Sequence, residues 1–335
     1  MARCPGSKNG PRAASFSSGL PRLALSFVLP EGFTIHPATG CFCSDRNRRL
    51  WMSLQRISAR NGSKGTMQNR SFASNLGIYA YAGGAIFLGL LGLASGDFAS
   101  VWQHVGPSVP FRVPLAYFTA LIELAAGLAL FWRRTARAGA GVLTVVYSVF
   151  ALLWVPEIFK FAGGFDAPGN FFEEFSLVAG GAVLFARFSP ADSAIFRRES
   201  LLARLLSLSA ISFGIVHIYD MPGLLTWIPN WIPPSQMFWA YATTIGFFAA
   251  AVAILSGILA PLASRLLTIE VISFELFVWI PKLIAAPHEH FIWAGNAISV
   301  AISGAIWAVA DSICRRAAER APAQTEPVTE ASAAV

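Results

Sequence analysis

From residue 76 onward, apolar residues run in long blocks instead of alternating with polar residues. Eight blocks of about 16–21 residues cover 77–94, 114–132, 138–155, 171–187, 201–219, 236–256, 263–280 and 291–310. A helix of 18–20 residues is about 27–30 Å long, the thickness of the hydrocarbon core of a bilayer. An open backbone amide has no partner in lipid, so these blocks are predicted to be membrane-spanning helices.

Composition agrees with this pattern. Of the 335 residues, 55% are hydrophobic and only 13% are charged, and the mean hydropathy is +0.56. A soluble domain carries about 25% charged residues, so an ordinary cytosolic enzyme, a disordered chain and a disulfide-stapled secreted module are excluded. We expect an all-α membrane protein with about eight transmembrane helices and the lipid bilayer as its surroundings.

The positive charge of the chain is concentrated at its start. Residues 1–72 carry 11 Lys and Arg against two acidic residues, and the remainder of the chain is slightly negative. This Ser-, Gly- and Arg-rich segment has no folding pattern, so we expect a disordered tail and no nucleic-acid partner. Translation starting at Met67 is a sharper hypothesis, because one basic residue then directly precedes the first apolar block; intact-mass detection of residues 1–66 would contradict it.

Basic residues predict the orientation of the helices. Three flank one side of the predicted spans, Arg112, Lys160 and Lys282, whereas twelve flank the other: Arg70, Arg133, Arg134, Arg137, Arg187, Arg197, Arg198, Arg204, Arg265, Arg315, Arg316 and Arg320. Because cytoplasmic loops are enriched in Lys and Arg, both termini are predicted to be cytoplasmic, in a bacterial-type inner (plasma) membrane.

The two sets of four spans resemble each other. The segment 116–119 (AYFT) recurs as 240–243 (AYAT), and 154–156 (WVP) recurs as 279–281 (WIP), at offsets of 124 and 125 residues. Each half has an even number of spans, so both halves enter from the same side and are parallel. We therefore expect two four-helix repeats, at 73–193 and 194–312, followed by a disordered cytoplasmic tail at 313–335.

Each unit has a Gly-rich first span, an outer loop with Trp and Pro, a second span opening near Pro and a basic cytoplasmic turn. In these features the chain resembles the DoxX-like membrane proteins, with the unit present twice across 77–310. The resemblance implies four-helix bundles. It also implies a link to membrane redox assemblies, since the family takes its name from a small subunit of a quinone-linked thiosulfate oxidoreductase.

Glu123 is the clearest polar anomaly, because it lies near the middle of the second span, where a charged side chain costs about 3 kcal/mol. Two outcomes are open: a protonated carboxyl that forms a proton or ligand site, or a structural hydrogen bond to another helix. Its counterpart in the repeat is Phe247, so the site is asymmetric. Candidate partners are Tyr117, Thr119, Thr144 and Tyr147, and Tyr241 is included as the counterpart of Tyr117.

Further carboxylates lie in or near the spans. Glu275 is deep in the seventh span and is a candidate for function, whereas Glu270 lies nearer the cytoplasmic end and can reach water or Arg265. Glu173 and Glu174 open the fourth span, where carboxylates also act as partners of the helix dipole.

The predicted outer side collects histidines and tryptophans. His217 and Asp220 are neighbours on one helix face, and His288 and His290 share a short loop on the same side. Together they could handle protons or, as weak candidates, bind a metal, although solvated side chains remain an alternative. The tryptophans form either an anchoring belt or the rim of an outward cleft: Trp102, Trp154, Trp227 and Trp279.

The chain lacks a Cys-x-x-Cys motif, a buried bis-His pair, a P-loop and a dinucleotide-binding motif. A stand-alone enzyme is therefore not expected, and redox chemistry would need a bound quinone or a redox partner subunit. The leading hypothesis is a subunit or accessory of quinone-linked membrane redox. The alternatives are a small-solute or proton-coupled transporter and a purely structural or assembly module.

Overall fold

The computed structural model describes residues 76–160 and 164–320. Within these residues all regular secondary structure is helical and no strand occurs, so the prediction of an all-α protein is confirmed. The predicted disordered tail 1–72 and the hypothetical start at Met67 lie outside the described residues.

The helices follow one another with short connections. The first described helix is Leu76–Ser95, and it is followed by α2 (Arg112–Ala129), α3 (Ala136–Lys160), α4 (Asp166–Arg187), α5 (Ala194–Arg197), α6 (Glu199–Tyr219), α7 (Met221–Trp227), α8 (Gln236–Ser256), α9 (Ala260–Phe274), the π-helical turn η1 (Glu275–Trp279), α10 (Ile280–Ala285) and α11 (His290–Arg320). Each predicted apolar block falls on one of the long helices, and the seventh falls on α9 together with η1.

Six of these helices are long and apolar enough to cross a membrane: Leu76–Ser95, α2, α3, α6, α8 and α11. The chain is therefore a multi-pass membrane protein. The two other predicted spans are helical but do not meet this description. Helix α4 carries four charged residues, and α9 is only 15 residues long before it passes into the π-helical turn.

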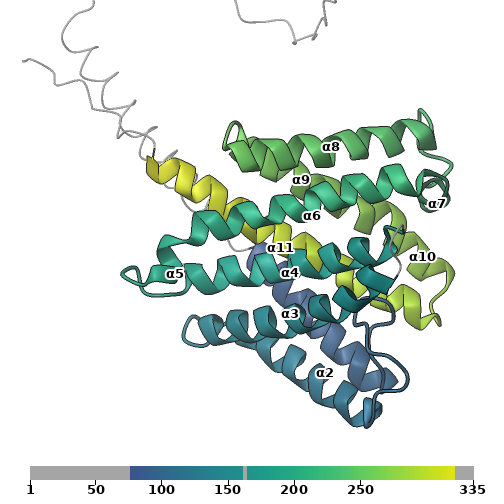
Figure 1. Cartoon of the computed structure of the whole chain (residues 1–335), viewed down its shortest axis with the longest axis horizontal. Helices are drawn as coiled ribbons and strands as arrows, with labels where there is room; N and C mark the ends of the chain where they lie inside the picture. The colour runs from purple at the N-terminus through teal and green to yellow at the C-terminus, as the bar shows by residue number, and fades with distance from the viewer. Residues whose placement is uncertain (1–75, 161–163, 321–335) are drawn as a thin grey trace, which may run out of the picture. The chain divides into compact units, whose positions relative to one another are not determined.

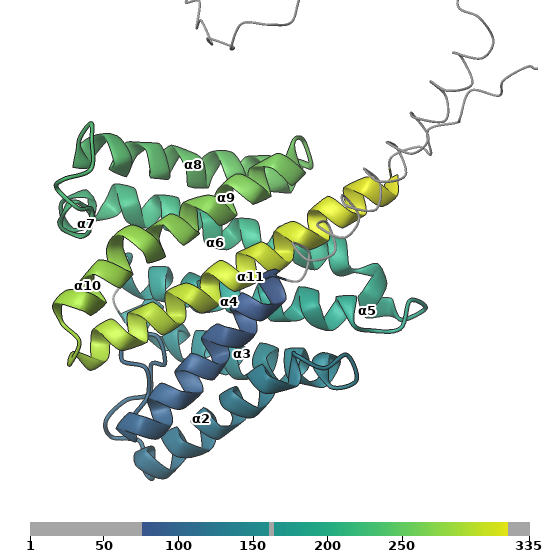
Figure 2. The ribbon, with the colours of Figure 1, turned by 180° about the vertical axis from the view of Figure 1, so that it is seen from behind.

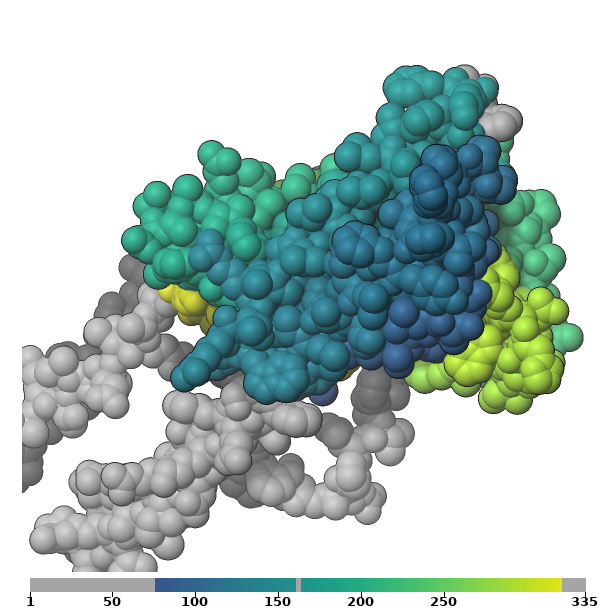
Figure 3. Space-filling view, turned by 90° about the horizontal axis from the view of Figure 1, so that it is seen from below, coloured from purple at the N-terminus to yellow at the C-terminus, as the bar shows by residue number. Residues whose placement is uncertain are grey.

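Helix α11 is the centre of the bundle. In its most apolar stretch 78% of the residues are buried, against 28–44% in the other five apolar helices. It packs against α4, α6 and α9, and in Figures 1 and 2 it runs diagonally through the molecule with α4 and α6 on one face and α9 and the Leu76–Ser95 helix on the other. Viewed from below, α2 and α3 cover the surface and α11 emerges only at the edges (Figure 3).

Small residues make this close packing possible. A Cβ atom on Gly304 of α11 would lie 2.1 Å from the backbone nitrogen of Tyr81 in the first helix, so glycine is required there. Gly180 of α4 meets α11 in the same way, because its Cβ would lie 2.5 Å from the Cβ of Ala305. Backbones that approach this closely gain dispersion contacts where no hydrophobic effect drives helix association in lipid.

The two ends of the bundle differ in chemistry. At one end lie α5 and the last turns of α11 (Figure 1). We call it the basic end because four arginines gather there around the carboxylates of Glu199 and Asp311: Arg187, Arg265, Arg315 and Arg316. At the other end lie α7 and α10 (Figure 1), and we call it the aromatic end because Trp102, Trp227 and Trp279 pack together there.

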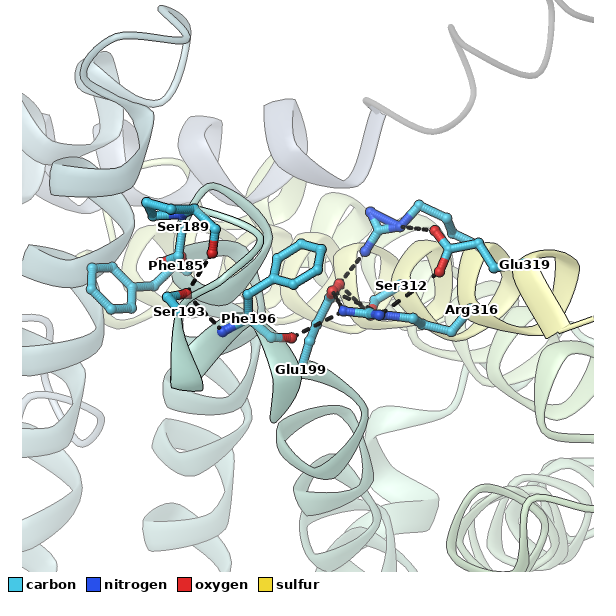
Figure 4. Close-up of polar contacts among 10 residues, drawn as sticks. Phe185, Ser189, Ser193, Phe196, Glu199, Ser312, Arg316 and Glu319 are labelled. Carbon is cyan, nitrogen blue, oxygen red and sulfur yellow. Dashed lines mark hydrogen bonds and ion pairs between the residues drawn. The ribbon is translucent and has the colours of Figure 1, made fainter.

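Glu199 fixes the basic end. Its carboxylate is fully buried, and it pairs with Arg315 and, at 2.6 Å, with Arg316 of α11. Ser312 Oγ also donates to it at 2.7 Å, as Figure 4 shows. These bonds hold the end of α11 against the start of α6. Helix α11 therefore continues to Arg320 instead of ending at 310, and the prediction that 313–320 belong to a disordered tail is wrong.

Candidate functional site

The first four long helices enclose a polar core, which we define as Tyr81, Glu123, Tyr147 and Glu174. One residue comes from each helix: Tyr81 from Leu76–Ser95, Glu123 from α2, Tyr147 from α3 and Glu174 from α4. All four side chains are at most 1% exposed. The phenol of Tyr81 donates to the backbone oxygen of Leu177 at 3.0 Å, and the rings of Tyr81 and Tyr147 meet edge to face at 6.1 Å.

Glu123 is held by a residue that the sequence did not single out. Gln103 Nε2, from the loop before α2, donates to Glu123 Oε1 at 2.7 Å, and Gln103 Oε1 accepts from the backbone nitrogen of Ala99 at 2.9 Å. The two threonine hydroxyls proposed as partners are engaged within their own helices, since Thr119 bonds Leu115 and Thr144 bonds Ala140. The sequence pattern does not reveal this pair, because Gln103 is a loop residue 20 positions before Glu123.

Glu174 is the least satisfied group of the polar core. It is fully buried, and neither of its carboxyl oxygens has a hydrogen-bond partner; the hydroxyl of Tyr147 has none either. Helix α4 begins at Asp166, so Glu174 lies more than two turns inside the helix and not at its N-terminus as expected. Buried polar groups are normally bonded to protein or to ordered water, so this core has the capacity to hold a proton or a small polar ligand.

A second site lies among α6, α8, α9 and α11. It is a cavity of about 180 Å³, which we call the aromatic pocket, and it is lined by Trp102, Glu173, Phe213, Val216, His217, Phe247, Val271, Phe274, Trp279, Ile298, Ser299 and Ile302. Trp102 and Glu173 close it from the side of the first four helices, and Trp102 Nε1 donates to Glu173 Oε2 at 2.6 Å. A cavity of about 150 Å³ accommodates a benzene ring, so the pocket has room for one six-membered ring.

The hydrogen bonds of His217 fix what it offers to a ligand. Its Nδ1 lies 3.3 Å from Thr244 Oγ1 and 3.4 Å from Thr243 Oγ1. Each threonine hydroxyl has a single proton, and each donates it to a backbone carbonyl of its own helix, at 2.6 Å for Thr244 and 2.9 Å for Thr243. Nδ1 is therefore the donor in a neutral ring, which leaves Nε2 as a hydrogen-bond acceptor.

Three of the four candidate rim tryptophans are brought together. Trp279 lies 5.8 Å from Trp102 and 5.2 Å from Trp227, and the ring of Phe291 stacks on Trp102 at 5.4 Å. Trp102 is only 5% exposed and lines the pocket instead of anchoring at a membrane surface. Trp154 lies apart and stacks on His104 at 4.1 Å.

The remaining candidates do not join either site. Tyr117 and Tyr241 are 41% and 55% exposed on the outside of α2 and α8. Asp220 lies at the end of α6, but its Oδ1 caps α7 by accepting from Gly223 at 3.1 Å instead of bonding His217. Glu275 begins the π-helical turn and has Ser299 of α11 as its side-chain partner. Since Arg265 pairs with Asp311 at 2.6 Å, the expected contact with Glu270 is not formed.

The histidines after α10 have separate roles. His288 is exposed, whereas His290 Nε2 bonds the backbone oxygen of Phe98 at 3.1 Å and so ties the start of α11 to the first loop. Among the described residues, no group of three or more His, Cys, Asp and Glu side chains could hold a metal ion.

These contacts define two candidate functional sites, the polar core and the aromatic pocket. Comparison of the chain with protein-family models, with curated proteins and with solved structures finds no match. What these two sites do therefore has to be argued from their own geometry.

Proposed function

We propose that this multi-pass membrane protein is a DoxX-like subunit or accessory of quinone-linked membrane redox, and that the aromatic pocket binds the ring of a quinol. The pocket offers an aromatic slot with two hydrogen-bond acceptors, the carboxylate of Glu173 and Nε2 of His217. That single arrangement carries the proposal, because an apolar cavity with a few convergent polar groups is the usual form of a small-molecule site. A bound quinol supplies two electrons and two protons, and it has two hydroxyl donors, one for each of the two acceptors.

The architecture behind this proposal is eight spans in two parallel four-helix repeats. Gly180 contacts Ala305, its own counterpart 125 residues later, as expected for residues on a two-fold axis between halves. The Leu76–Ser95 helix and α6 run in the same direction (Figures 1 and 2), which supports a parallel arrangement. Helices α4 and the α9–η1–α10 segment lie alongside the six apolar helices and would be the remaining two spans.

The proposed orientation rests on the charge distribution. The basic end would face the cytoplasm, with both termini on that side, and the aromatic end would face outward across a bacterial-type inner membrane. The pocket would then open toward the outer half of the bilayer, where a lipid-soluble quinol is available. A redox partner subunit would have to supply the electron acceptor, since the sequence lacks the motifs of a haem, nucleotide or dithiol centre.

Binding of a short-chain quinol to the purified protein in nanodiscs tests the proposal. We expect saturable binding that is tighter for the quinol than for the quinone, and loss of about tenfold or more in affinity in Glu173→Gln and in His217→Leu. Glu157→Gln is the matched control, since Glu157 lies at the same end but outside the pocket, where it pairs with Lys160 at 2.6 Å. Equal binding of quinol and quinone, or unchanged binding in both variants, would refute it.

Proton-coupled transport is the second candidate, because the polar core holds two buried carboxyls, Glu123 and Glu174, with unpaired oxygens on the second. A pH-sensitive dye inside proteoliposomes would report proton flux, and Glu123→Gln and Glu174→Gln should reduce it. Wild-type behaviour of Glu123→Gln, Glu275→Gln and His217→Ala in both assays would favour a structural or assembly module instead.

A further inference from the structure

A groove on the outer surface of α8 and α9 adjoins the aromatic pocket, with Phe274 in both linings. It encloses about 520 Å³ and is bounded by the chain between α7 and α8, by α8, and by the end of α9 with η1. Its walls lie on the outside of the helical bundle, since the side chains of Trp231, Ile269 and Phe277 are 65%, 64% and 44% exposed. We call it the lateral groove, because a molecule dissolved in the bilayer could enter it from the side.

Glu270 gives this apolar groove one ionisable side chain. It is the one acidic or basic residue among the described residues that line the groove, and its Oε1 is buried without a hydrogen-bond partner. The carboxyl packs against Gly246 of α8, where a Cβ atom would lie 2.5 Å from Oε2. Its nearest basic neighbour on the helix, Arg265, is committed to Asp311 at 2.6 Å. Arg265 is therefore not available to pair with the Glu270 carboxyl when that carboxyl is ionised.

The aromatic walls complement such a charge. Trp231 and Trp239 lie on one side and Phe274 and Phe277 on the other, and the faces of tryptophan rings attract cations, the more strongly when water is excluded. A carboxylate within an apolar wall is costly until an opposite charge pairs with it. The volume falls in the usual range of sites for drug-sized molecules, about 300–1,000 Å³.

We propose that the lateral groove binds a lipophilic organic cation, with the carboxylate of Glu270 as its counter-ion and the tryptophans as its aromatic wall. The occupant enters from the bilayer, carries a single delocalised or substituted cationic centre, and presents apolar groups to the remaining surface of the groove. This site adjoins the aromatic pocket, since Phe274 lines both, but the two differ in their polar groups, because Glu270 does not line the pocket and His217 does not line the groove.

Two ions of the same shape and opposite charge test the proposal. The full chain in nanodiscs is incubated with tritiated tetraphenylphosphonium, and binding to empty nanodiscs of the same lipid is subtracted. We expect saturable binding of the cation that Glu270→Gln weakens by about tenfold or more, while tetraphenylborate neither binds at this site nor displaces the cation.

Glu275→Gln is the matched control, because Glu275 is a half-buried carboxyl five residues further on that does not line the groove. The affinity of this variant for the cation should stay within about twofold of the wild type. Trp231→Ala changes an exposed residue, so folding should be preserved. We expect this variant to bind the cation several-fold more weakly than the wild type. Equal binding of both ions, no binding above empty nanodiscs, or unchanged binding in both Glu270→Gln and Trp231→Ala would overturn the proposal.

Discussion

Replacing Glu199 by glutamine should release the last turns of α11 from α6. The carboxylate is fully buried and takes charged hydrogen bonds from Arg315 and Arg316 and a neutral one from Ser312. Glutamine keeps the volume and one acceptor, but its amide group faces a guanidinium and cannot accept from it. The change therefore isolates the charge, with little alteration of packing.

The expected loss can be worked from these contacts. A hydrogen bond to a charged group contributes about 1.5–3 kcal/mol, and at least one is lost. Removal of one partner from a fully buried pair costs about 3–5 kcal/mol, but the side chains of Arg315 and Arg316 are 31% and 22% exposed and regain some hydration. We therefore expect Glu199→Gln to lower the free energy of unfolding by about 2–3 kcal/mol.

Glu319 provides the matched control. It approaches the same two arginines, each at 3.8 Å, but its side chain is 53% exposed. Exposed pairs contribute about 0.2–1 kcal/mol, so Glu319→Gln should change the free energy of unfolding by about 0.5 kcal/mol or less.

Equilibrium unfolding in mixed micelles with increasing dodecyl sulfate, followed by circular dichroism, measures both variants. Limited trypsin digestion gives a second measurement, because fraying of α11 exposes the bonds after Arg315 and Arg316, and Glu199→Gln should be cleaved faster. If the two variants unfold with the same free energy and are cleaved at the same rate, Glu199 does not fix the basic end and the reasoning fails.

Three further predictions concern packing, the polar core and orientation. Gly304→Ala places a Cβ atom 2.1 Å from the backbone of Tyr81, so it should lower the free energy of unfolding by about 1–3 kcal/mol, whereas Gly83→Ala, which meets nothing within 4 Å, should not lower it. Gln103→Leu leaves Glu123 and the backbone nitrogen of Ala99 unpaired and should cost about 1–3 kcal/mol in the same unfolding assay; Thr119→Val, which removes only a bond within α2, should cost less. In a variant whose native cysteines are replaced by serine, a cysteine at the exposed Ser108 should react with an impermeant maleimide in intact cells, and one at the exposed Asp192 should react only after permeabilisation; the reverse pattern would contradict the proposed orientation.

The helices were predictable because lipid imposes a simple requirement on sequence. A segment that spans a bilayer must be apolar over some twenty residues, so block lengths alone placed α6 and α8 to within two residues of their observed bounds. The end of α11 was missed for the opposite reason. Five of the residues 311–320 are charged, so the apolar block ends before them. The partner of Arg315 and Arg316 is Glu199, more than a hundred residues earlier in the chain, which the apolar pattern cannot reveal.

The sites were predictable only in part, because they depend on which helix faces meet. Glu123 and His217 stand out as polar residues in apolar helices, and both are buried in the structure. Gln103 and Tyr81 gave no such signal, since a glutamine in a loop and a tyrosine in a span are ordinary at those positions. The apolar block starts at residue 171 and so predicts Glu174 near the helix end, whereas α4 begins at Asp166.

Under the proposed repeat, the polar core and the aromatic pocket occupy corresponding places in the two halves. The counterpart of Glu123 is Phe247 and that of Glu174 is Ser299, at offsets of 124 and 125 residues, and both counterparts line the aromatic pocket. The two bundles then have the same helix packing, set by small residues such as Gly180 and Ala305, but different side chains in their interiors. Replacing two carboxyls by a phenyl ring and a short hydroxyl leaves Glu173, which comes from the first half, as the acidic residue of the second interior, and it leaves a cavity that an aromatic ring can fill. A duplicated bundle can in this way separate proton-handling groups from a ring-binding pocket, with Glu173 and Glu174, adjacent in sequence, facing one site each.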